Sequence, residues 1–224
     1  MQRVYGLEIP ETLEEVCHPA HMALVVYDMQ VGILSQLPAP ERITRPVVEV
    51  LRAARSGGFR IFFTRHMSLP IEAAGVFQLR TAMAWQRVRR VEKVHPAFPR
   101  DSPQFQLIPE LAPHSTEVIF DKISMSCFVG TPLDMALRDC GLIAFAIVGV
   151  ALEVGIEPSV RHGADLGYIP VVVEDACGGR DEAARQRALA GFRFAGDAML
   201  TASETICRLL QRGSVQWHRD PSVQ

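Results

Sequence analysis

Hydrophobic and polar positions follow two alternating patterns along the chain. Short apolar runs predict strands near 23–27, 60–64, 117–120, 142–148, 169–173 and 198–201. Apolar residues at helical spacing predict helices near 40–56, 131–140, 155–166, 181–194 and 203–212. Strands that alternate with helices in this way form a parallel sheet with right-handed crossovers. We therefore predict an α/β fold, built as a single three-layer domain over 1–224.

The stretch between 65 and 110 interrupts this alternation because it contains no clear strand. One amphipathic pattern in it predicts a helix at 76–91, and a proline-rich stretch follows. Long excursions between parallel strands are binding segments more often than plain connections. Since this stretch follows a strand that ends at Thr64, we expect it at the carboxyl edge of the sheet, where ligands bind in such folds. We interpret it as a lid.

Composition and charge narrow the class of protein. The 224 residues include 23 Lys plus Arg and 25 Asp plus Glu, for a formal charge of −2. A protein that binds nucleic acid through phosphate neutralisation is normally basic, so that class is disfavoured. The longest apolar run, 141–152, is too short to span a bilayer, and 1–20 shows no signal-peptide pattern. We expect a cytoplasmic protein without a nucleic-acid or membrane partner.

The cysteines and histidines do not form a metal-binding or disulfide pattern. The cysteines are odd in number, widely spaced and without a CxxC pair, at Cys17, Cys127, Cys140, Cys177 and Cys207. His66 follows the second predicted strand but lacks partners at ligand spacing. We therefore predict neither a metal nor a cofactor.

Polar residues directly follow three of the predicted strands. Asp28 comes after the first strand, Lys122 after the third, and the turn 149–155 (GVALEVG) after the fourth. Because the carboxyl ends of parallel strands meet at one edge, the acid and the ammonium can form an acid/base pair there. A structural ion pair would explain the carboxylate as well, and lysines usually point to water.

Three segments together resemble the isochorismatase-like, or cysteine hydrolase, superfamily. They are ALVVYDMQ at 23–30, DKISMSCFVGTPLDMALR at 121–138 and GVALEVGIEPSVRHGADLGYIPVVVEDA at 149–176. Order and spacing match over most of the chain, from about 23 to 210. The resemblance implies a six-stranded parallel sheet flanked by helices, a small-molecule substrate and a homo-oligomer, either a dimer or a tetramer.

The resemblance also implies roles for individual residues. Asp28 and Lys122 match the catalytic aspartate and lysine of the family. Gln30 fits the family's D-x-Q pattern and is expected to orient water or the acid. A non-proline cis peptide is implied between Val150 and Ala151.

One position departs from the pattern of the amide-cleaving relatives. Those proteins have a cysteine nucleophile at the start of the helix after the fourth strand, and this chain has Gly155 there. Glycine has no side chain, so covalent catalysis from this position is excluded. One branch, the isochorismatases, also has glycine here and hydrolyses a vinyl ether by protonating the enol-ether carbon. The resemblance therefore implies Asp28 as a general acid, with open space beside Gly155 for the substrate.

Several neighbours are expected to bind the substrate. Ala151 and Glu153 stand where that branch commonly has an aromatic residue and a histidine, so the substrate is not predicted to be isochorismate. The lid is locally basic. Its positive charges could attract a carboxylate of the substrate, or they could belong to a solvated helix face. The predicted substrate-binding residues are Gln30, Trp85, Arg87, Val150, Ala151 and Glu153.

Three functions remain open at this point. The first is general-acid hydrolysis, by Asp28, of a small carboxylated molecule such as a vinyl ether. The second is a catalytically silent binding or scaffold protein that retains the fold. The third is an amidase whose thiol has moved, with Cys127 or Cys177 as the nucleophile. A buried cysteine that acts as a small hydrophobic residue is the simpler explanation of either thiol.

Overall fold

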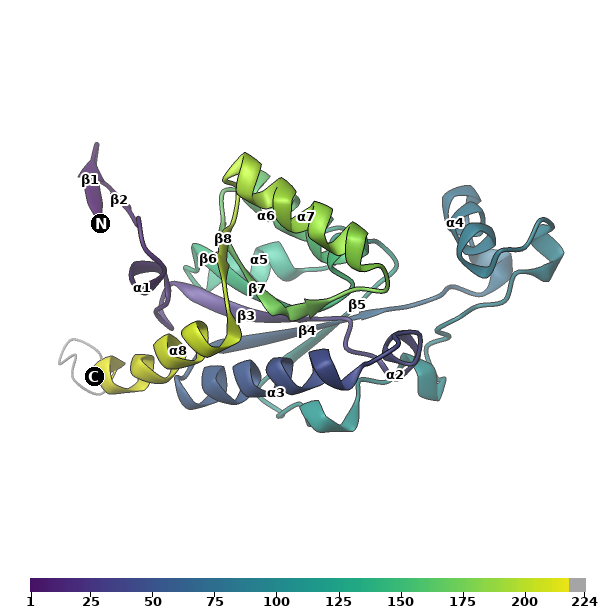
Figure 1. Cartoon of the computed structure of the whole chain (residues 1–224), viewed down its shortest axis with the longest axis horizontal. Helices are drawn as coiled ribbons and strands as arrows, with labels where there is room; N and C mark the ends of the chain where they lie inside the picture. Colours follow the sequence, from purple (N-terminus) through teal and green to yellow (C-terminus); the bar gives the residue numbers. More distant parts are fainter. Residues whose placement is uncertain (218–224) are drawn as a thin grey trace.

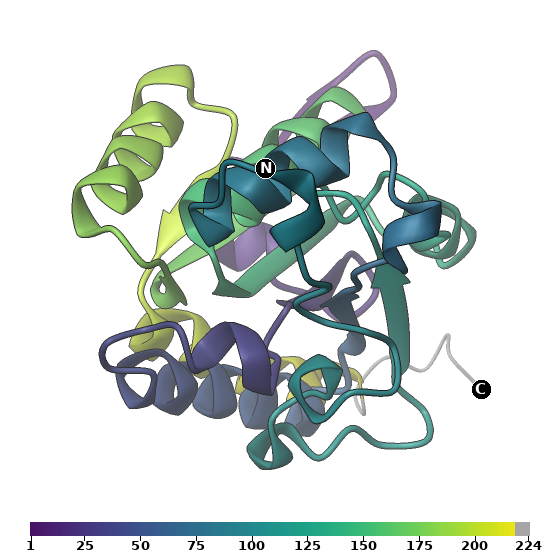
Figure 2. The same cartoon turned by 90° about the vertical axis from the view of Figure 1, so that its right-hand side faces the viewer.

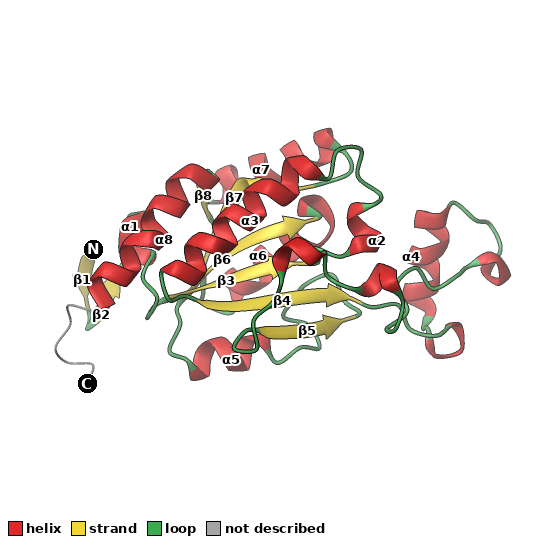
Figure 3. Ribbon diagram, turned by 90° about the horizontal axis from the view of Figure 1, so that it is seen from below, coloured by secondary structure: helices red, strands yellow, loops and turns green. Residues whose placement is uncertain are grey.

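The computed structural model describes residues 1–217, with a parallel sheet between two layers of helices (Figures 1 and 3). The sheet has six strands in the order β5-β4-β3-β6-β7-β8. The predicted α/β class and the six parallel strands are therefore confirmed. The strands are β3 (Met22–Tyr27), β4 (Arg60–His66), β5 (Val118–Lys122), β6 (Ala144–Val150), β7 (Ile169–Gly178) and β8 (Met199–Thr201).

Helices connect the strands and cover both faces of the sheet. One layer contains α3 (Glu41–Ser56) and α8 (Ser203–Trp217), which pack against each other. The other contains α5 (Leu133–Asp139), α6 (Glu157–Asp165) and α7 (Glu182–Ala195). No described helix has both the length and the apolar character that crossing a membrane requires.

Strand β3 runs through the middle of the sheet and is buried along its whole length. Its alternate residues belong to two different hydrophobic clusters, because successive side chains of a strand point to opposite faces. Val26 packs in the cluster of α3 and α8, whereas Val25 and Tyr27 pack in the cluster of α5, α6 and α7. Burial on both faces explains why the strand reads as a continuous apolar run.

The direction of the sheet order reverses between β3 and β6. The chain continues from β3 outward through β4 to β5, then returns beside β3 as β6 and continues outward through β7 to β8. Ligands of open α/β sheets bind at the carboxyl ends of the strands that flank such a switch point. In this protein those ends are Tyr27 and Val150, followed by Asp28 and Ala151.

The predicted lid lies beyond the carboxyl ends of the strands (Figures 1 and 2). Beyond the end of β4 at His66, it contains α4 (Val76–Gln86) and short 3-10 turns and no further strand. The helix predicted at 76–91 ends early because Arg87 adopts a left-handed conformation, with φ 55°. The side chain of Gln86 then holds the segment after α4 in place, since it hydrogen-bonds the backbone N–H and carbonyl of His95.

Two further differences concern elements that the hydrophobic pattern missed. The chain begins with an antiparallel hairpin of β1 (Gln2–Val4) and β2 (Leu7–Ile9), followed by short α1 (Leu13–Val16). All six hairpin residues are exposed, so the hairpin has no buried face to mark it in the sequence. A second short helix, α2 (Val31–Leu34), begins just after the switch point.

Candidate active site

Asp28 stands directly after β3 and is held by two neighbouring strands. Its backbone has a left-handed conformation, with φ 47°, which aspartate tolerates better than most residues. Oδ1 accepts a hydrogen bond of 2.6 Å from the Thr64 hydroxyl in β4, and Oδ2 accepts one of 2.6 Å from Nζ of Lys122 in β5. Only 3% of Asp28 is exposed, so its carboxyl group is fixed in position.

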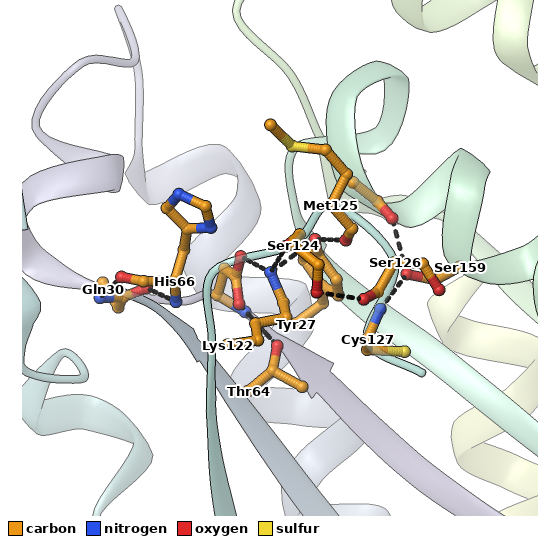
Figure 4. A network of polar contacts seen from close by, with 12 residues as sticks. Tyr27, Gln30, Thr64, His66, Lys122, Ser124, Met125, Ser126, Cys127 and Ser159 are labelled. Atoms are coloured by element: carbon orange, nitrogen blue, oxygen red, sulfur yellow. Dashed lines mark hydrogen bonds and ion pairs between the residues drawn. The ribbon is translucent and has the colours of Figure 1, made fainter. Parts of the chain in front are cut away.

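Lys122 is the last residue of β5, and its side chain has no exposed surface. Nζ donates to Oδ2 of Asp28 at 2.6 Å, to the Tyr27 hydroxyl at 2.8 Å and to the carbonyl oxygen of Ser124 at 3.1 Å (Figure 4). An ammonium group has three N–H donors, so this network uses all of them. The pairing of acid and ammonium that the sequence indicated is therefore present.

Gly155 lies in the turn of a π-helix, Leu152–Ile156, which leads from β6 into α6. A Cβ atom at Gly155 would lie well inside 3.0 Å of the Tyr27 hydroxyl, closer than Cβ atoms approach other groups. The prediction of open space beside Gly155 is therefore wrong, because the Tyr27 phenol fills that space. The tyrosine was not among the predicted site residues, although it was the one aromatic residue of its strand.

The phenol of Tyr27 is held in its protonated form. Burial raises its pKa well above the usual 10, and the negative charge of Asp28 raises it further. The hydroxyl donates to the carbonyl oxygen of Met125 and accepts from Lys122 (Figure 4). Tyr27 therefore belongs to one buried polar network with the acid and the ammonium.

The turn after β6 brings the backbone of two strands close together. The peptide between Val150 and Ala151 is cis, as the resemblance implied. Gly149 has φ 128°, and a Cβ atom there would collide with the backbone carbonyl of Tyr27. The carbonyl of Ala151 then accepts the N–H groups of Gly155 and Ile156, at 2.9 and 3.1 Å, which starts the π-turn.

A cavity of about 330 Å³ opens at this edge of the sheet, between the switch point and the 65–110 segment. Its volume suits a small molecule. Its wall includes six of the predicted site residues, Asp28, Trp85, Val150, Ala151, Glu153 and Gly155. Lys122, Gln30 and Arg87 are not part of the wall.

Gln30 has a structural position instead of a place beside the substrate. Its side chain is fully buried. Oε1 accepts the backbone N–H of His66 at 2.6 Å, and Nε2 donates to the carbonyls of His66 and Phe105 at 3.0 and 2.8 Å. With every one of these contacts directed at backbone, Gln30 joins the end of β4 to the 65–110 segment.

The arginines and the lysine of the 65–110 segment are not part of the cavity wall. Arg87 is exposed at the end of α4. The neighbouring Trp85 is part of the cavity wall, with 51% of its surface exposed. The arginine on the cavity wall is Arg180, which was not among the predicted site residues. It was missed because β7 extends to Gly178, beyond the predicted end at 173, and so brings the following turn to the carboxyl edge.

Glu153 faces the turn that contains Arg180. Its Oε1 accepts the backbone N–H of Arg180 at 3.1 Å, and its side chain fills the space above Gly179. Oε2 is buried without a hydrogen-bond partner among the residues that the structure describes. Both Glu153 and Arg180 are part of the cavity wall, and the backbone of Arg180 bonds the carboxylate of Glu153.

Neither thiol proposed as a moved nucleophile reaches the cavity. Cys127 and Cys177 have no exposed surface, and burial raises the pKa of each to about 12. The cavity wall contains no cysteine from the described part of the chain. A thiol that is neither ionised nor accessible is a poor nucleophile.

The imidazole ring of His66 belongs to a residue of the cavity wall. Burial lowers its pKa below the usual 6.5. The ring also packs edge-on against Phe98, with 6.2 Å between the ring centroids. His66 is therefore neutral at pH 7. Within residues 1–217, no three His, Cys, Asp or Glu side chains converge as metal ligands would.

Comparison with solved structures identifies proteins of the same fold. A cysteine hydrolase from Pseudomonas syringae pv. phaseolicola superimposes with a TM-score of 0.75 and 22% identity, covering 88% of this chain and 95% of that one. N-carbamoylsarcosine amidase from Thermoplasma acidophilum has a TM-score of 0.65 and 21% identity, with 82% and 96% coverage. These likenesses establish the three-layer architecture.

Comparison of sequences goes further than the fold. Ureidoacrylate amidohydrolase RutB of Enterobacter sp. (strain 638) is 30% identical over 174 residues, which cover 70% of this chain and 75% of that protein. RutB of Klebsiella pneumoniae subsp. pneumoniae is 30% identical over 183 residues, with 75% and 76% coverage. Residues 22–204 match the family model of the isochorismatase domain. With most of its length matched by that model, the chain belongs to the isochorismatase family of hydrolases.

Proposed function

We propose that this protein hydrolyses an acid-labile bond of a small carboxylated molecule, with Asp28 as the general acid and without a covalent intermediate. One observation supports this reading above the others. The carboxyl group of Asp28 lines the cavity and is bonded to Lys122, whereas the cavity wall in the described part of the chain offers no thiol. Among the described residues, the site therefore has a carboxyl group that can transfer a proton but no thiol to attack a carbonyl carbon.

The proton moves along the short contact between the paired groups. Nζ of Lys122 gives the proton of its 2.6 Å hydrogen bond to Oδ2 of Asp28, which passes a proton to the substrate. In a vinyl ether, protonation of the enol carbon forms an oxocarbenium ion, and water adds to it. The proton that this water loses goes to Asp28 and from there back to Nζ of Lys122, and the resulting hemiketal separates into a carbonyl compound and an alcohol. Atoms and charge balance over the cycle.

A carboxylate on the substrate has a partner in the cavity wall. Arg180 is part of the cavity wall, and no ion pair of its guanidinium is found among the described residues. Guanidinium groups bind carboxylates through two parallel hydrogen bonds. Arg180 thus takes the anion-binding part that the sequence analysis assigned to Arg87.

The amidase alternative is less well supported. The related RutB proteins are named for an amide hydrolysis. In this chain the position of Gly155 has no thiol, and Cys127 and Cys177 are buried with raised pKa values. An amidase mechanism would need one of these thiols to become accessible and ionised.

The test is a substrate panel assayed by NMR and by intact-protein mass spectrometry. The panel pairs small carboxylated enol ethers with carboxylated amides, including ureidoacrylate. The variants are Asp28→Asn, which keeps the side-chain shape, and the double variant Cys127→Ala/Cys177→Ala as a matched control. We expect turnover of an enol ether, a loss of about 10²–10⁴-fold in Asp28→Asn, and little change in the cysteine variant.

Other outcomes would contradict the proposal. An acyl adduct on the protein during turnover would show a covalent mechanism. Turnover of amides alone, abolished in the cysteine variant, would support a moved thiol. A ligand that raises the melting temperature of the protein but is never consumed would indicate a binding protein instead.

A further inference from the structure

Tyr27 is the buried polar residue of this site that the proposed mechanism does not use. It is the last residue of β3, and 2% of its surface is exposed. The alternation of side chains along the strand turns its ring toward α5, α6 and α7, and thus toward the start of α6. The ring forms part of the cavity wall.

The directions of the hydrogen bonds at Tyr27 are set by its partners. The ammonium of Lys122 has no lone pair, so the 2.8 Å contact is a bond from Nζ to the phenol oxygen. The phenol proton therefore goes to the carbonyl oxygen of Met125, which can only accept. Lys122 also lies over the ring of Tyr27, with Nζ 4.3 Å from its centroid. Tyr27 holds the ammonium through its oxygen and through its ring face.

The same hydroxyl occupies the space above Gly155. No side chain at position 155 can coexist with the present position of the phenol, because even its Cβ atom would overlap the hydroxyl. Conversely, the absence of a side chain at Gly155 is what allows the phenol to reach Lys122. Tyr27 ends β3, whereas Gly155 lies in the π-helix that follows β6, so the fit depends on both sides of the switch point.

We infer that Tyr27 is a positioning residue of this site: its hydroxyl directs the Lys122 ammonium at Asp28, and its ring excludes any side chain from the space above Gly155. This inference rests on the proposed thiol-free function and deepens it. A phenylalanine would fill the space but would leave one N–H of Lys122 buried without an acceptor. The raised pKa of Tyr27 keeps the phenol neutral, so it accepts from the ammonium without adding a second negative charge beside Asp28.

The first test uses the fact that the chain has two lysines, Lys93 and Lys122. Selective ¹³C labelling of lysine side chains gives two NMR signals. Lys93 is exposed in the 65–110 segment and serves as an internal control. In Tyr27→Phe we expect the Cε signal of Lys122 to move and that of Lys93 to stay. A Lys122 signal that does not move in a folded Tyr27→Phe protein would overturn the inference.

The second test asks whether Tyr27 excludes a side chain from position 155. It compares Gly155→Cys with the double variant Tyr27→Ala/Gly155→Cys, using alkylation by iodoacetamide followed by peptide mapping. Without the phenol, the introduced thiol lies on the cavity wall near Lys122, whose positive charge favours the thiolate. We expect alkylation at position 155 to be more than about tenfold faster in the double variant. The buried Cys127 and Cys177 provide internal controls for unfolding.

The second test also has an outcome that would contradict the role of Tyr27. If Gly155→Cys alone kept the wild-type melting temperature and reacted as fast as the double variant, Tyr27 would not control that space. Neither test requires a substrate. Failure of the enol-ether panel would therefore count against the proposed function, whereas failure of these two tests would count against the role of Tyr27.

Discussion

Thr64 binds Asp28 through its side chain and its backbone. The hydroxyl donates to Oδ1 of Asp28 at 2.6 Å, and the carbonyl oxygen of Thr64 accepts the backbone N–H of Asp28 at 3.2 Å. Thr64 is fully buried in β4, between the strands that carry the acid and the ammonium. It thus fixes which way the carboxyl group of Asp28 faces.

Replacing Thr64 with valine removes this hydrogen bond and keeps the shape of the side chain. We expect Thr64→Val to lower the free energy of unfolding by about 1–3 kcal/mol, because a buried acceptor that carries charge loses its donor. Urea denaturation measures the change. The matched control is Thr201→Val, since the hydroxyl of Thr201 makes only a 3.4 Å contact to the carbonyl of Ala202. Equal losses in the two variants would show that the bond to Asp28 contributes nothing specific.

Replacing either Asp28 or Lys122 alone should lower the free energy of unfolding strongly. Asp28→Asn and Lys122→Met each leave one buried partner, and we expect each to lower the free energy of unfolding by about 3–5 kcal/mol. The double variant leaves no unpaired charge, so its loss should be clearly smaller than the sum of the two. A double-mutant cycle from urea denaturation gives the coupling energy. Additive losses would mean that the two groups do not stabilise each other.

The free energy of unfolding should decrease as the pH is lowered, in part because His66 takes up a proton. Burial lowers the pKa of His66 in the folded protein, so the unfolded chain takes up a proton at a higher pH than the folded one. This contribution is complete above the usual pKa of 6.5 and is lost as the pH falls through that value toward the folded pKa. We expect the decrease in unfolding free energy between pH 7.5 and 5.5 to be smaller in His66→Asn. An unchanged decrease would assign it to other groups.

The cysteines should differ sharply in their reactivity. Cys127 and Cys177 are fully buried, whereas Cys140 and Cys207 are partly exposed. Burial raises the pKa of Cys127 and Cys177 to about 12, so very little thiolate is present at pH 8. We expect iodoacetamide to label Cys140 in the native protein, and to label the two buried thiols only after denaturation. Native labelling of Cys127 that abolishes turnover would revive the amidase alternative.

Gly149 should tolerate no side chain. Its φ of 128° is a conformation that side-chain-bearing residues rarely adopt, and a Cβ atom would collide with the backbone carbonyl of Tyr27. We expect Gly149→Ala to lower the free energy of unfolding by more than about 3 kcal/mol or to prevent folding. Gly75→Ala is the control, because Gly75 has nothing within 4 Å of a Cβ atom, and it should change stability by less than about 1 kcal/mol. Thermal denaturation of both variants would show whether they differ.

Much of the fold could be predicted from the pattern of residues. The central strands β3 and β6 are buried along their whole length, so they read as continuous apolar runs, and Asp28 directly follows the end of β3. The exposed hairpin of β1 and β2 has no such contrast and was missed. The end of β7 was placed too early, because Glu174 and Asp175 interrupt its apolar run while the strand continues to Gly178.

The candidate site divides in the same way. The amino-acid sequence alone determined that this chain has an acid and a lysine after buried parallel strands, and that position 155 has no nucleophile. Only the tertiary structure decided that Tyr27 fills the space above Gly155, that Gln30 bonds backbone, and that Arg180 replaces Arg87 at the cavity. The physical reason is that local patterns determine which element a residue joins and which face it occupies. What its side chain touches depends on the register between strands and turns that are far apart in the chain.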